Sequence, residues 1–194
     1  MEIKFRNLYA DEIECRINQI NEKGLTLLLY KDARCDMNIL DETVGVMNWQ
    51  RKHTRDNANC IVSIWDSEKK QWIEKEDTGT ESNTEKEKGL ASDSFKRAST
   101  NWGIGRCLYT APFIYVSKAD RDGAINYNSY KNKANKDACN DKFIVEKILY
   151  DEKDNIIALS IINLNLKKRI YVWQQPKKSE KSNNGGENGK RINN

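Results

Sequence analysis

The sequence has few of the residues from which catalytic and metal sites are most often built. It contains one histidine, His53, and five scattered cysteines with no Cys-x-x-Cys pair. Structural zinc sites and Ser/His or Cys/His nucleophiles draw on clustered thiolates and imidazoles, so we expect neither. Unclustered cysteines are also more typical of a reducing compartment than of a disulfide framework.

Long apolar runs and targeting segments are also missing. No stretch approaches the roughly 18 apolar residues that a membrane-spanning helix needs, and the N-terminus lacks the apolar region of a signal peptide. We therefore expect a cytoplasmic protein with no membrane contact. Mean hydropathy is −0.85, with 38% hydrophobic and 32% charged residues, which indicates a modest core and a heavily charged surface.

Nucleotide-binding motifs are absent as well. Gly103-Ile104-Gly105 has no third glycine and follows a predicted helix instead of opening one, so it is no dinucleotide fingerprint. Gly189-Lys190 lacks the earlier glycine of a Walker A motif and is followed by Arg191. We expect neither ATP hydrolysis nor any cofactor.

Net charge alone does not predict a nucleic-acid partner. The chain carries a formal charge of +4, but residues 174–194 hold five basic and two acidic residues and so account for most of it. The remaining residues are nearly neutral. A basic surface must therefore be found locally.

The first half of the chain contains clear element signals. Ile13, Ile17 and Ile20 recur at helical spacing, which predicts a helix over 9–24, followed by a strand over 25–30. A second helix is predicted over 36–44, with Asp36 as N-cap and Gly45 at its end. Alternating runs at 47–50, 60–65 and 71–75, separated by turn residues, predict a three-stranded antiparallel meander.

The clearest element is a long helix over 84–102. Thr84 to Glu87 has the form of a capping box. Ala91, Phe95, Ala98 and Trp102 then form an apolar stripe that should lie on the meander. The predicted fold class is α+β, an antiparallel β-meander packed on this helix as a β-β-β-α core.

The second half of the chain is predicted to be less regular. Residues 110–116 should be extended around Pro112, and 119–142 should form a basic loop or linker. Apolar runs at 143–150 and 156–173 flank a turn and predict a terminal hairpin or small sheet. The Asn-, Gly-, Ser- and Lys-rich segment 174–194 should be a disordered basic tail. Residues 1–118 would then form the core domain.

Two local groups of basic residues are candidate phosphate contacts. Lys86, Lys96 and Arg97 share one side of the predicted helix, away from its apolar stripe. A solvated helix face with an Asp93–Arg97 ion pair explains the same pattern. The second group follows a predicted strand into its turn and comprises Arg51, Lys52 and Arg55. It fits a DNA-guiding hairpin, and it equally fits an edge protected by charge.

Carboxylates offer a different function, that of a metal-dependent nuclease. Asp66, Glu74 and Glu76 lie on one predicted hairpin, where Glu74 and Glu76 would share a strand face. Such oxygens can hold Mg²⁺, although any solvated strand face has the same appearance.

The stretch 89–109 resembles the signature helix of the Rad fifty-two family of single-strand annealing proteins. In that family an aspartate is followed three residues on by Lys-Arg-Ala and then by an aromatic-Gly pair. The matching residues here are Asp93, Lys96, Arg97, Ala98, Trp102 and Gly103. Tyr30 to Trp49 is similar to a second family segment, and Asp77-Thr78-Gly79 to the Asp-x-Gly after its third strand. The resemblance covers roughly residues 9–118 and is nearest to bacteriophage and prophage members.

The resemblance implies a non-enzymatic protein that binds single-stranded DNA and anneals complementary strands without ATP, as a ring or helical homo-oligomer. It implies that Lys96, Arg97 and Tyr30 line a DNA-binding groove, and more loosely that the basic hairpin makes a second contact. Thr100 stands where the family has a further groove arginine, so Lys23, Lys31 or Arg34 are candidates to supply that charge.

The C-terminal tail is a possible contact to single-strand-binding protein. Two other functions stay open at this point: the metal-dependent nuclease, and a non-catalytic module that binds a replication protein through the tail.

Overall fold

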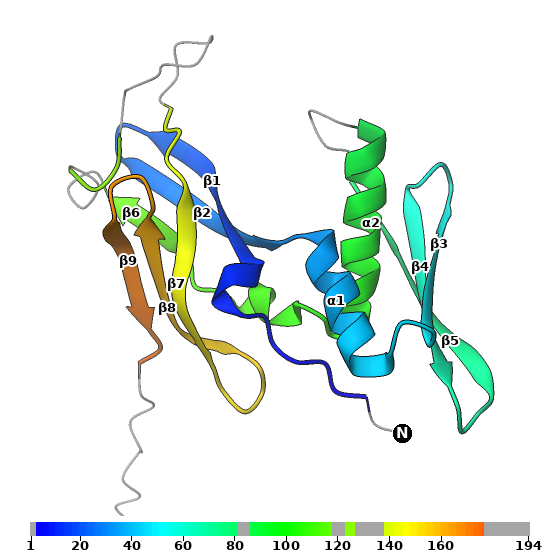
Figure 1. The fold of residues 1–194 in the computed structure, drawn as a ribbon. Coiled ribbons are helices and arrows are strands. Elements are labelled where there is room, and N and C mark those ends of the chain that lie inside the picture. Colours follow the sequence, from blue (N-terminus) through cyan, green and yellow to red (C-terminus); the bar gives the residue numbers. More distant parts are fainter. Residues whose placement is uncertain (1–2, 81–85, 118–122, 127–137, 177–194) are drawn as a thin grey trace, which may run out of the picture.

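The computed structural model describes residues 3–80, 86–117, 123–126 and 138–176. Its elements are, in order, η1 (Ala10–Glu12), β1 (Ile13–Asn21), β2 (Gly24–Lys31), α1 (Ala33–Val44), β3 (Trp49–Thr54), β4 (Asn59–Asp66), β5 (Gln71–Thr78), α2 (Lys86–Trp102), η2 (Arg106–Thr110), β6 (Ile114–Ser117), β7 (Phe143–Tyr150), β8 (Ile156–Asn163) and β9 (Lys168–Gln174). They form two sheets, with α1 and α2 between them (Figure 1).

The larger sheet has six strands in the order β6-β2-β1-β7-β8-β9, and the smaller has three in the order β3-β4-β5. Every neighbouring pair is antiparallel. The chain is therefore α+β with antiparallel sheets, as the sequence predicts. Strands from residues 143–174 lie in the same sheet as β1 and β2, a pairing between distant segments that no local sequence signal indicates.

The prediction of a helix over 9–24 is wrong, because most of this segment forms strand β1. Ile13 and Cys15 point into the core at strand spacing, and the register then shifts between Ile17 and Gln19. A bulge at Asn18 inserts one residue, so Ile17 and Ile20 both face the same side although three positions separate them. The apparent helical spacing is thus a strand interrupted by a bulge.

Helix α1 begins earlier than the sequence predicts. Asp32, not Asp36, is its N-cap, and the Asp32 carboxylate accepts a hydrogen bond from the Arg34 amide. Asp36 lies inside the helix and is fully buried. The predicted end is confirmed, because Gly45 follows with a φ of +87°, a conformation that favours glycine.

The three-stranded meander is confirmed. Trp49 lies opposite Ile64, and Ile64 lies opposite Ile73, so one register runs across all three strands. The turn between β3 and β4 has positive φ at Arg55, Asp56 and Asn57. These are the residues at which the sequence places the turn.

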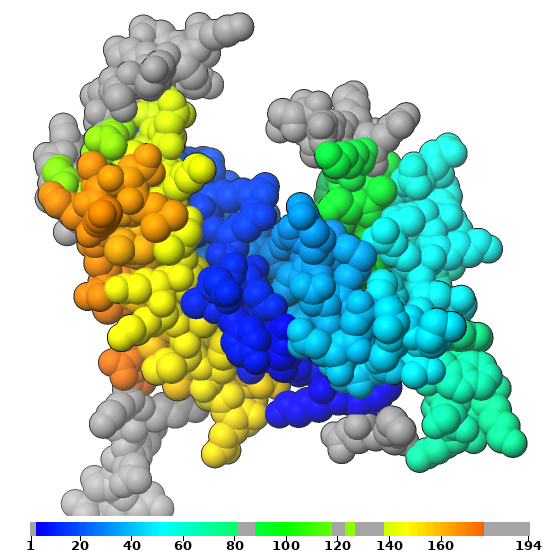
Figure 2. Space-filling model, viewed as in Figure 1, coloured from blue at the N-terminus to red at the C-terminus, as the bar shows by residue number. Residues whose placement is uncertain are grey.

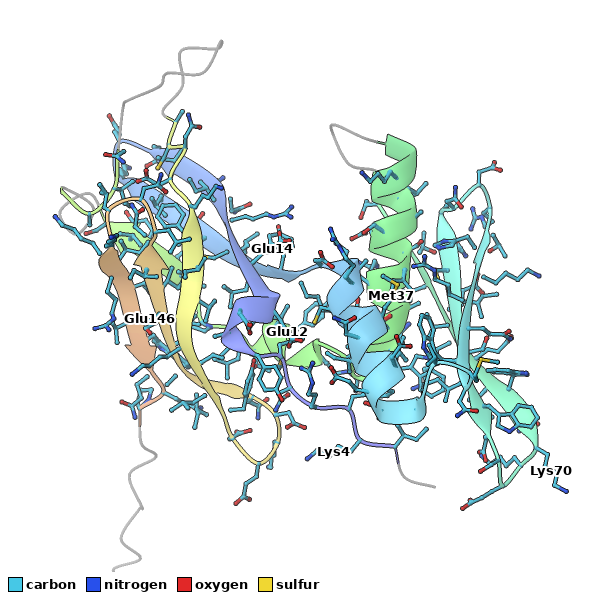
Figure 3. All side chains as sticks on the ribbon, viewed as in Figure 1. Lys4, Glu12, Glu14, Met37, Lys70 and Glu146 are labelled. Atoms are coloured by element: carbon cyan, nitrogen blue, oxygen red, sulfur yellow. The ribbon has the colours of Figure 1, made fainter. Side chains whose placement is uncertain are left out.

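Helix α2 packs against β4 and β5. Phe95 and Ala98 are fully buried, and the Trp102 indole donates a hydrogen bond of 3.0 Å to the Val62 carbonyl. The ring of Trp49 stacks on Phe95 from the β3 side, with centroids 6.1 Å apart. Side chains of α1 pack on the other flank of α2. Met37 lies there, beside α2 (Figure 3). The predicted capping residue Thr84 lies outside the described residues.

The segment around Pro112 is partly extended, because η2 comes first and strand β6 begins only at Ile114. The two C-terminal apolar runs form three strands. A second turn, marked by the positive φ of Lys167, divides the run from Ile156 to Trp173. Most of the predicted loop 119–142 and nearly all of the predicted tail lie outside the described residues.

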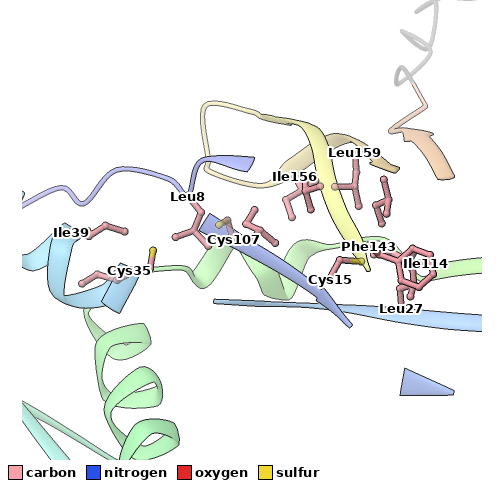
Figure 4. Packing of buried hydrophobic residues seen from close by; sticks show 14 of the residues in the cluster. Leu8, Cys15, Leu27, Cys35, Ile39, Cys107, Ile114, Phe143, Ile156 and Leu159 are labelled. Carbon is pink, nitrogen blue, oxygen red and sulfur yellow. The ribbon is translucent and has the colours of Figure 1, made fainter. Parts of the chain in front are cut away.

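One part of the hydrophobic core is formed by buried side chains on the strands of the larger sheet. Leu27, Ile114, Phe143 and Leu159 meet there (Figure 4). Leu8 and other buried side chains continue this core toward α1, which joins the two halves of the molecule. Among the described residues, none of the helices is long and apolar enough to cross a membrane.

Candidate nucleic-acid interface

A cleft of about 310 Å³ lies where β2, α2 and η2 come together. The molecular surface is notched between the β1–β2 hairpin and α2 (Figure 2). The cleft is lined by Leu29, Tyr30, Lys31, Asp93, Lys96, Arg97, Thr100, Gly105, Leu108 and Tyr109. Three residues that the family resemblance assigns to a DNA groove, Tyr30, Lys96 and Arg97, are therefore neighbours although two sit on α2 and one on β2.

Each cleft cation lies beside a carboxylate. The Lys96 ammonium is 3.9 Å from Asp93 Oδ1, and the Arg97 Nε is 3.3 Å from Asp77 Oδ1. Both cations are partly exposed, so these pairs are screened by water and worth little by themselves. A phosphate can therefore replace the carboxylates at small cost. The Asp93–Arg97 ion pair considered from the sequence is replaced by these two pairs.

Lys31 ties the wall made by β2 to both helices, through a buried ion pair with Asp36 on α1 and a hydrogen bond to α2. Lys31 Nζ donates to the Asp36 carboxylate and also to the Lys96 carbonyl, at 3.3 Å. Burial raises the pKa of Asp36 to about 6, and burial likewise lowers the pKa of Lys31. Lys31 thus holds the cleft together and is not a free surface cation. Lys23 lies exposed in the β1–β2 turn, outside the cleft lining.

The Asp77-Thr78-Gly79 segment fixes α2 against β5. Asp77 accepts from Arg97 and from the Asn101 side chain. A Cβ on Gly79 would lie 2.5 Å from the Ser94 nitrogen and 2.7 Å from the Leu90 carbonyl oxygen, so only glycine allows this approach. The next residue, Thr80, donates its amide and hydroxyl to Asp93. This short segment therefore positions the two carboxylates that hold the cleft cations.

The basic hairpin is not part of this cleft. Arg51 places its guanidinium 4.8 Å from the Phe95 ring centroid, on the β3 side of α2. Lys52 is exposed on the opposite face of the meander, since neighbouring strand residues alternate, and Arg55 is exposed in the turn. Arg34 is exposed at the start of α1 beside Asp32. Lys86 begins α2, and its side chain lies outside the described part of the chain.

His53 lies on β3, two residues after Arg51 and on the same face of the strand. Its Nδ1 is 3.4 Å from the Ser94 hydroxyl on α2. Burial, and secondarily the charge of Arg51, lower its pKa below 6.5. The ring is therefore held neutral at physiological pH, as a packing residue between β3 and α2.

Each of the three candidate magnesium ligands accepts hydrogen bonds from different partners. Glu74 accepts from the Ser63 hydroxyl at 3.2 Å, and Glu76 accepts from the Asn59 amide at 2.7 Å. Asp66 accepts from two backbone amides of its own turn. Within the described ranges, no three His, Cys, Asp or Glu residues are grouped so that they could hold a metal ion.

All five cysteines are free thiols. Burial raises the pKa of Cys15 and Cys35 to about 12 and of Cys60 to about 11. Thiols with such pKa values are poor nucleophiles at neutral pH.

A larger and mostly apolar cavity of about 640 Å³ lies where η1 meets β7, β8 and β9. Leu149, Val172 and Trp173 contribute to its lining, with Tyr9 at one side. It contains none of the residues that the sequence places in a DNA groove, so we centre the candidate site on the cleft at α2.

Sequence reasoning missed Tyr109, which lines the cleft from η2 with 75% of its surface exposed. An exposed aromatic residue has no sequence signature that separates it from a core aromatic, so only the fold identifies it.

The chain matches no protein-family model, no curated protein and no solved structure at a significant level.

Proposed function

We propose that this protein binds single-stranded DNA in the cleft between β2 and α2 and anneals complementary strands without ATP, as a homo-oligomer in the cytoplasm of a phage's bacterial host. The observation that carries this proposal is the convergence of Tyr30, Lys96 and Arg97 in one cleft. The resemblance to the Rad fifty-two family supplies the activity and the ring or helical assembly.

The chemistry of the cleft suits this function. Annealing requires a grip on phosphate that is indifferent to sequence, and cations beside an aromatic ring provide it. Lys96 and Arg97 are adjacent on α2 and both reach the cleft, so they can contact consecutive phosphates. Base pairing is itself downhill, so the protein needs only to hold strands and bring them together.

The direct test is binding of a labelled single strand by fluorescence anisotropy over a range of salt concentrations. We expect the Lys96→Ala/Arg97→Ala variant to bind more weakly. Its salt slope should fall by about 0.7 for each phosphate that the variant no longer neutralises. Lys147→Ala/Lys153→Ala is the matched control, because both lysines are exposed on β7 and its turn, away from the cleft.

Two further measurements complete the test. Complementary labelled strands should anneal faster with the protein than without it, in the absence of nucleotide. Light scattering and negative-stain imaging should show an assembly of several subunits. A monodisperse monomer that has no affinity for single strands at low salt would overturn the proposal.

A further inference from the structure

Four aromatic side chains, Tyr30, Tyr109, Phe113 and Tyr115, are exposed around the outer surface of β2 and β6. Tyr30 and Tyr115 expose 39% and 42% of their surface, and Tyr109 and Phe113 expose 75% and 77%. We call this set the aromatic face. Outward positions of a half-solvated antiparallel sheet are usually polar. Several exposed rings at such positions therefore indicate a binding surface.

The strand register explains why the rings of Tyr30, Phe113 and Tyr115 share one side. Ile114 lies opposite Leu27 and both are buried, whereas Tyr115 lies opposite Thr26 on the outer side. Because side chains alternate along a strand, Phe113 and Tyr115 project outward together, as Tyr30 does on β2.

Three rings of the aromatic face, those of Tyr30, Phe113 and Tyr115, have contacts that hold them in place without a ligand. The Phe113 and Tyr115 rings are parallel within 7°, with centroids 6.3 Å apart. The Tyr115 hydroxyl donates to the Lys23 carbonyl at 2.9 Å, which fixes that ring over the start of β2. On the other side, the Arg16 guanidinium lies 5.4 Å from the Tyr30 ring centroid. Preformed ring positions reduce the entropy cost of stacking a ligand on them.

The aromatic face is continuous with the cation-bearing cleft. Tyr30 and Tyr109 belong to both, since they line the cleft together with Lys96 and Arg97. A strand whose phosphates contact α2 therefore has its bases within reach of aromatic rings on the β2 and η2 side. Aromatic rings suit this role because every base has a flat face that stacks without regard to sequence.

We infer that the aromatic face is a base-stacking surface for single-stranded DNA, with Tyr109 and Phe113 as its outermost contacts. This inference rests on the proposed function and adds that the phosphates and the bases of the bound strand contact different walls of the cleft. Phosphates face Lys96 and Arg97, and bases stack on the β2, η2 and β6 side.

The test compares two strands of equal length, oligothymidine and the same backbone without bases. Tyr109→Leu and Phe113→Leu are suitable variants because both side chains are largely exposed and contribute little to the core. Each should weaken oligothymidine binding by about 5- to 150-fold, the range expected for losing one stacked base. Binding of the abasic strand should be unchanged, and so should the salt slope.

Two controls separate stacking from other effects. Tyr109→Phe keeps the ring and should bind oligothymidine like the unmodified protein. Tyr9→Leu removes another largely exposed tyrosine, which lies at the start of η1 outside the cleft lining, and should leave both affinities unchanged. In addition, strands that carry iodouracil should crosslink to Tyr109 or Phe113 on irradiation.

The outcomes distinguish this inference from the function on which it rests. If Lys96→Ala/Arg97→Ala loses binding while both leucine variants keep full affinity for oligothymidine, the stacking surface is wrong and the proposed function stands. If the leucine variants lower the oligomer size and leave oligothymidine affinity unchanged, the aromatic face contacts a second copy of the chain, and the inference is overturned. If the unmodified protein binds neither strand, both fall.

Discussion

The Nε of Arg97 on α2 lies 3.3 Å from Oδ1 of Asp77 on β5, so the cation proposed to hold phosphate is already paired with a carboxylate. Asp77 also accepts a hydrogen bond from the Asn101 side chain, which keeps it in place. In the proposed complex, a DNA phosphate would compete with Asp77 for Arg97, and the exposed setting of the pair would keep that competition mild.

Replacing Asp77 by Asn should strengthen DNA binding. The amide keeps an acceptor oxygen for Asn101 but removes the charge that competes with phosphate. We expect affinity for single strands at low salt to rise by about two- to fivefold, in line with the small value of exposed ion pairs. Anisotropy titration measures it, with Glu152→Gln as control, because Glu152 is exposed in the β7–β8 turn. An unchanged or lower affinity would contradict competition at Arg97.

Gly79→Ala should destabilise the protein. The added Cβ would meet backbone atoms of Leu90 and Ser94 on α2 at under 3 Å, and backbone cannot move aside cheaply. We expect a loss of about 1–3 kcal/mol in the free energy of unfolding, measured by urea denaturation. Gly103→Ala separates this clash from backbone strain, because Gly103 has a φ of +109° and nothing within 4 Å of its Cβ position. An unchanged free energy of unfolding in Gly79→Ala would contradict the steric clash.

The buried Lys31–Asp36 pair should behave as a unit. Asp36→Leu leaves a buried ammonium without its counter-charge, and Lys31→Met leaves a buried carboxylate without its own. Each should cost about 3–5 kcal/mol in the free energy of unfolding. Lys31→Met/Asp36→Leu leaves no unpaired charge and should cost less than either single variant. Additive losses in this double-mutant cycle would show that the residues do not depend on each other.

The pKa of His53 should lie below 6.5, because burial and Arg51 both disfavour its charged form. As the chain has one histidine, its ring protons give a single NMR titration curve. The folded state binds this proton less tightly than the unfolded chain does. The contribution to stability is therefore complete above pH 6.5 and is lost as pH falls from 6.5 toward the folded-state pKa.

Urea unfolding at pH 7 and pH 5.5 checks that linkage. The unmodified protein should lose more stability between these pH values than His53→Gln does, since the variant lacks the titrating ring. Comparison with the variant cancels other groups, including Asp36, whose pKa of about 6 is raised by burial. A His53 pKa at or above 6.5 would contradict the structural account.

The accuracy of the sequence-based predictions depends on whether the signal is local. The meander and α2 are recognisable because alternation, turn residues and the apolar stripe around Phe95 and Ala98 act within a few positions. Strand β1 is misread as a helix because a bulge at Asn18 changes the spacing of its isoleucines. The start of α1 is misplaced for a related reason. An aspartate can cap a helix or lie within it, and only burial against Lys31 assigns Asp36 to the helix interior.

By itself the sequence determines the residue types of the candidate site, namely adjacent cations on a helix followed by an aromatic-Gly pair. The tertiary structure decides which of those residues share a surface. It brings Tyr30 to Lys96 and Arg97, separates Arg51 from them by placing it on Phe95, and exposes Tyr109 and Phe113. The physical reason is that helix and strand patterns follow from neighbouring residues, whereas a cleft and an exposed face depend on which distant segments pair and which side chains remain uncovered.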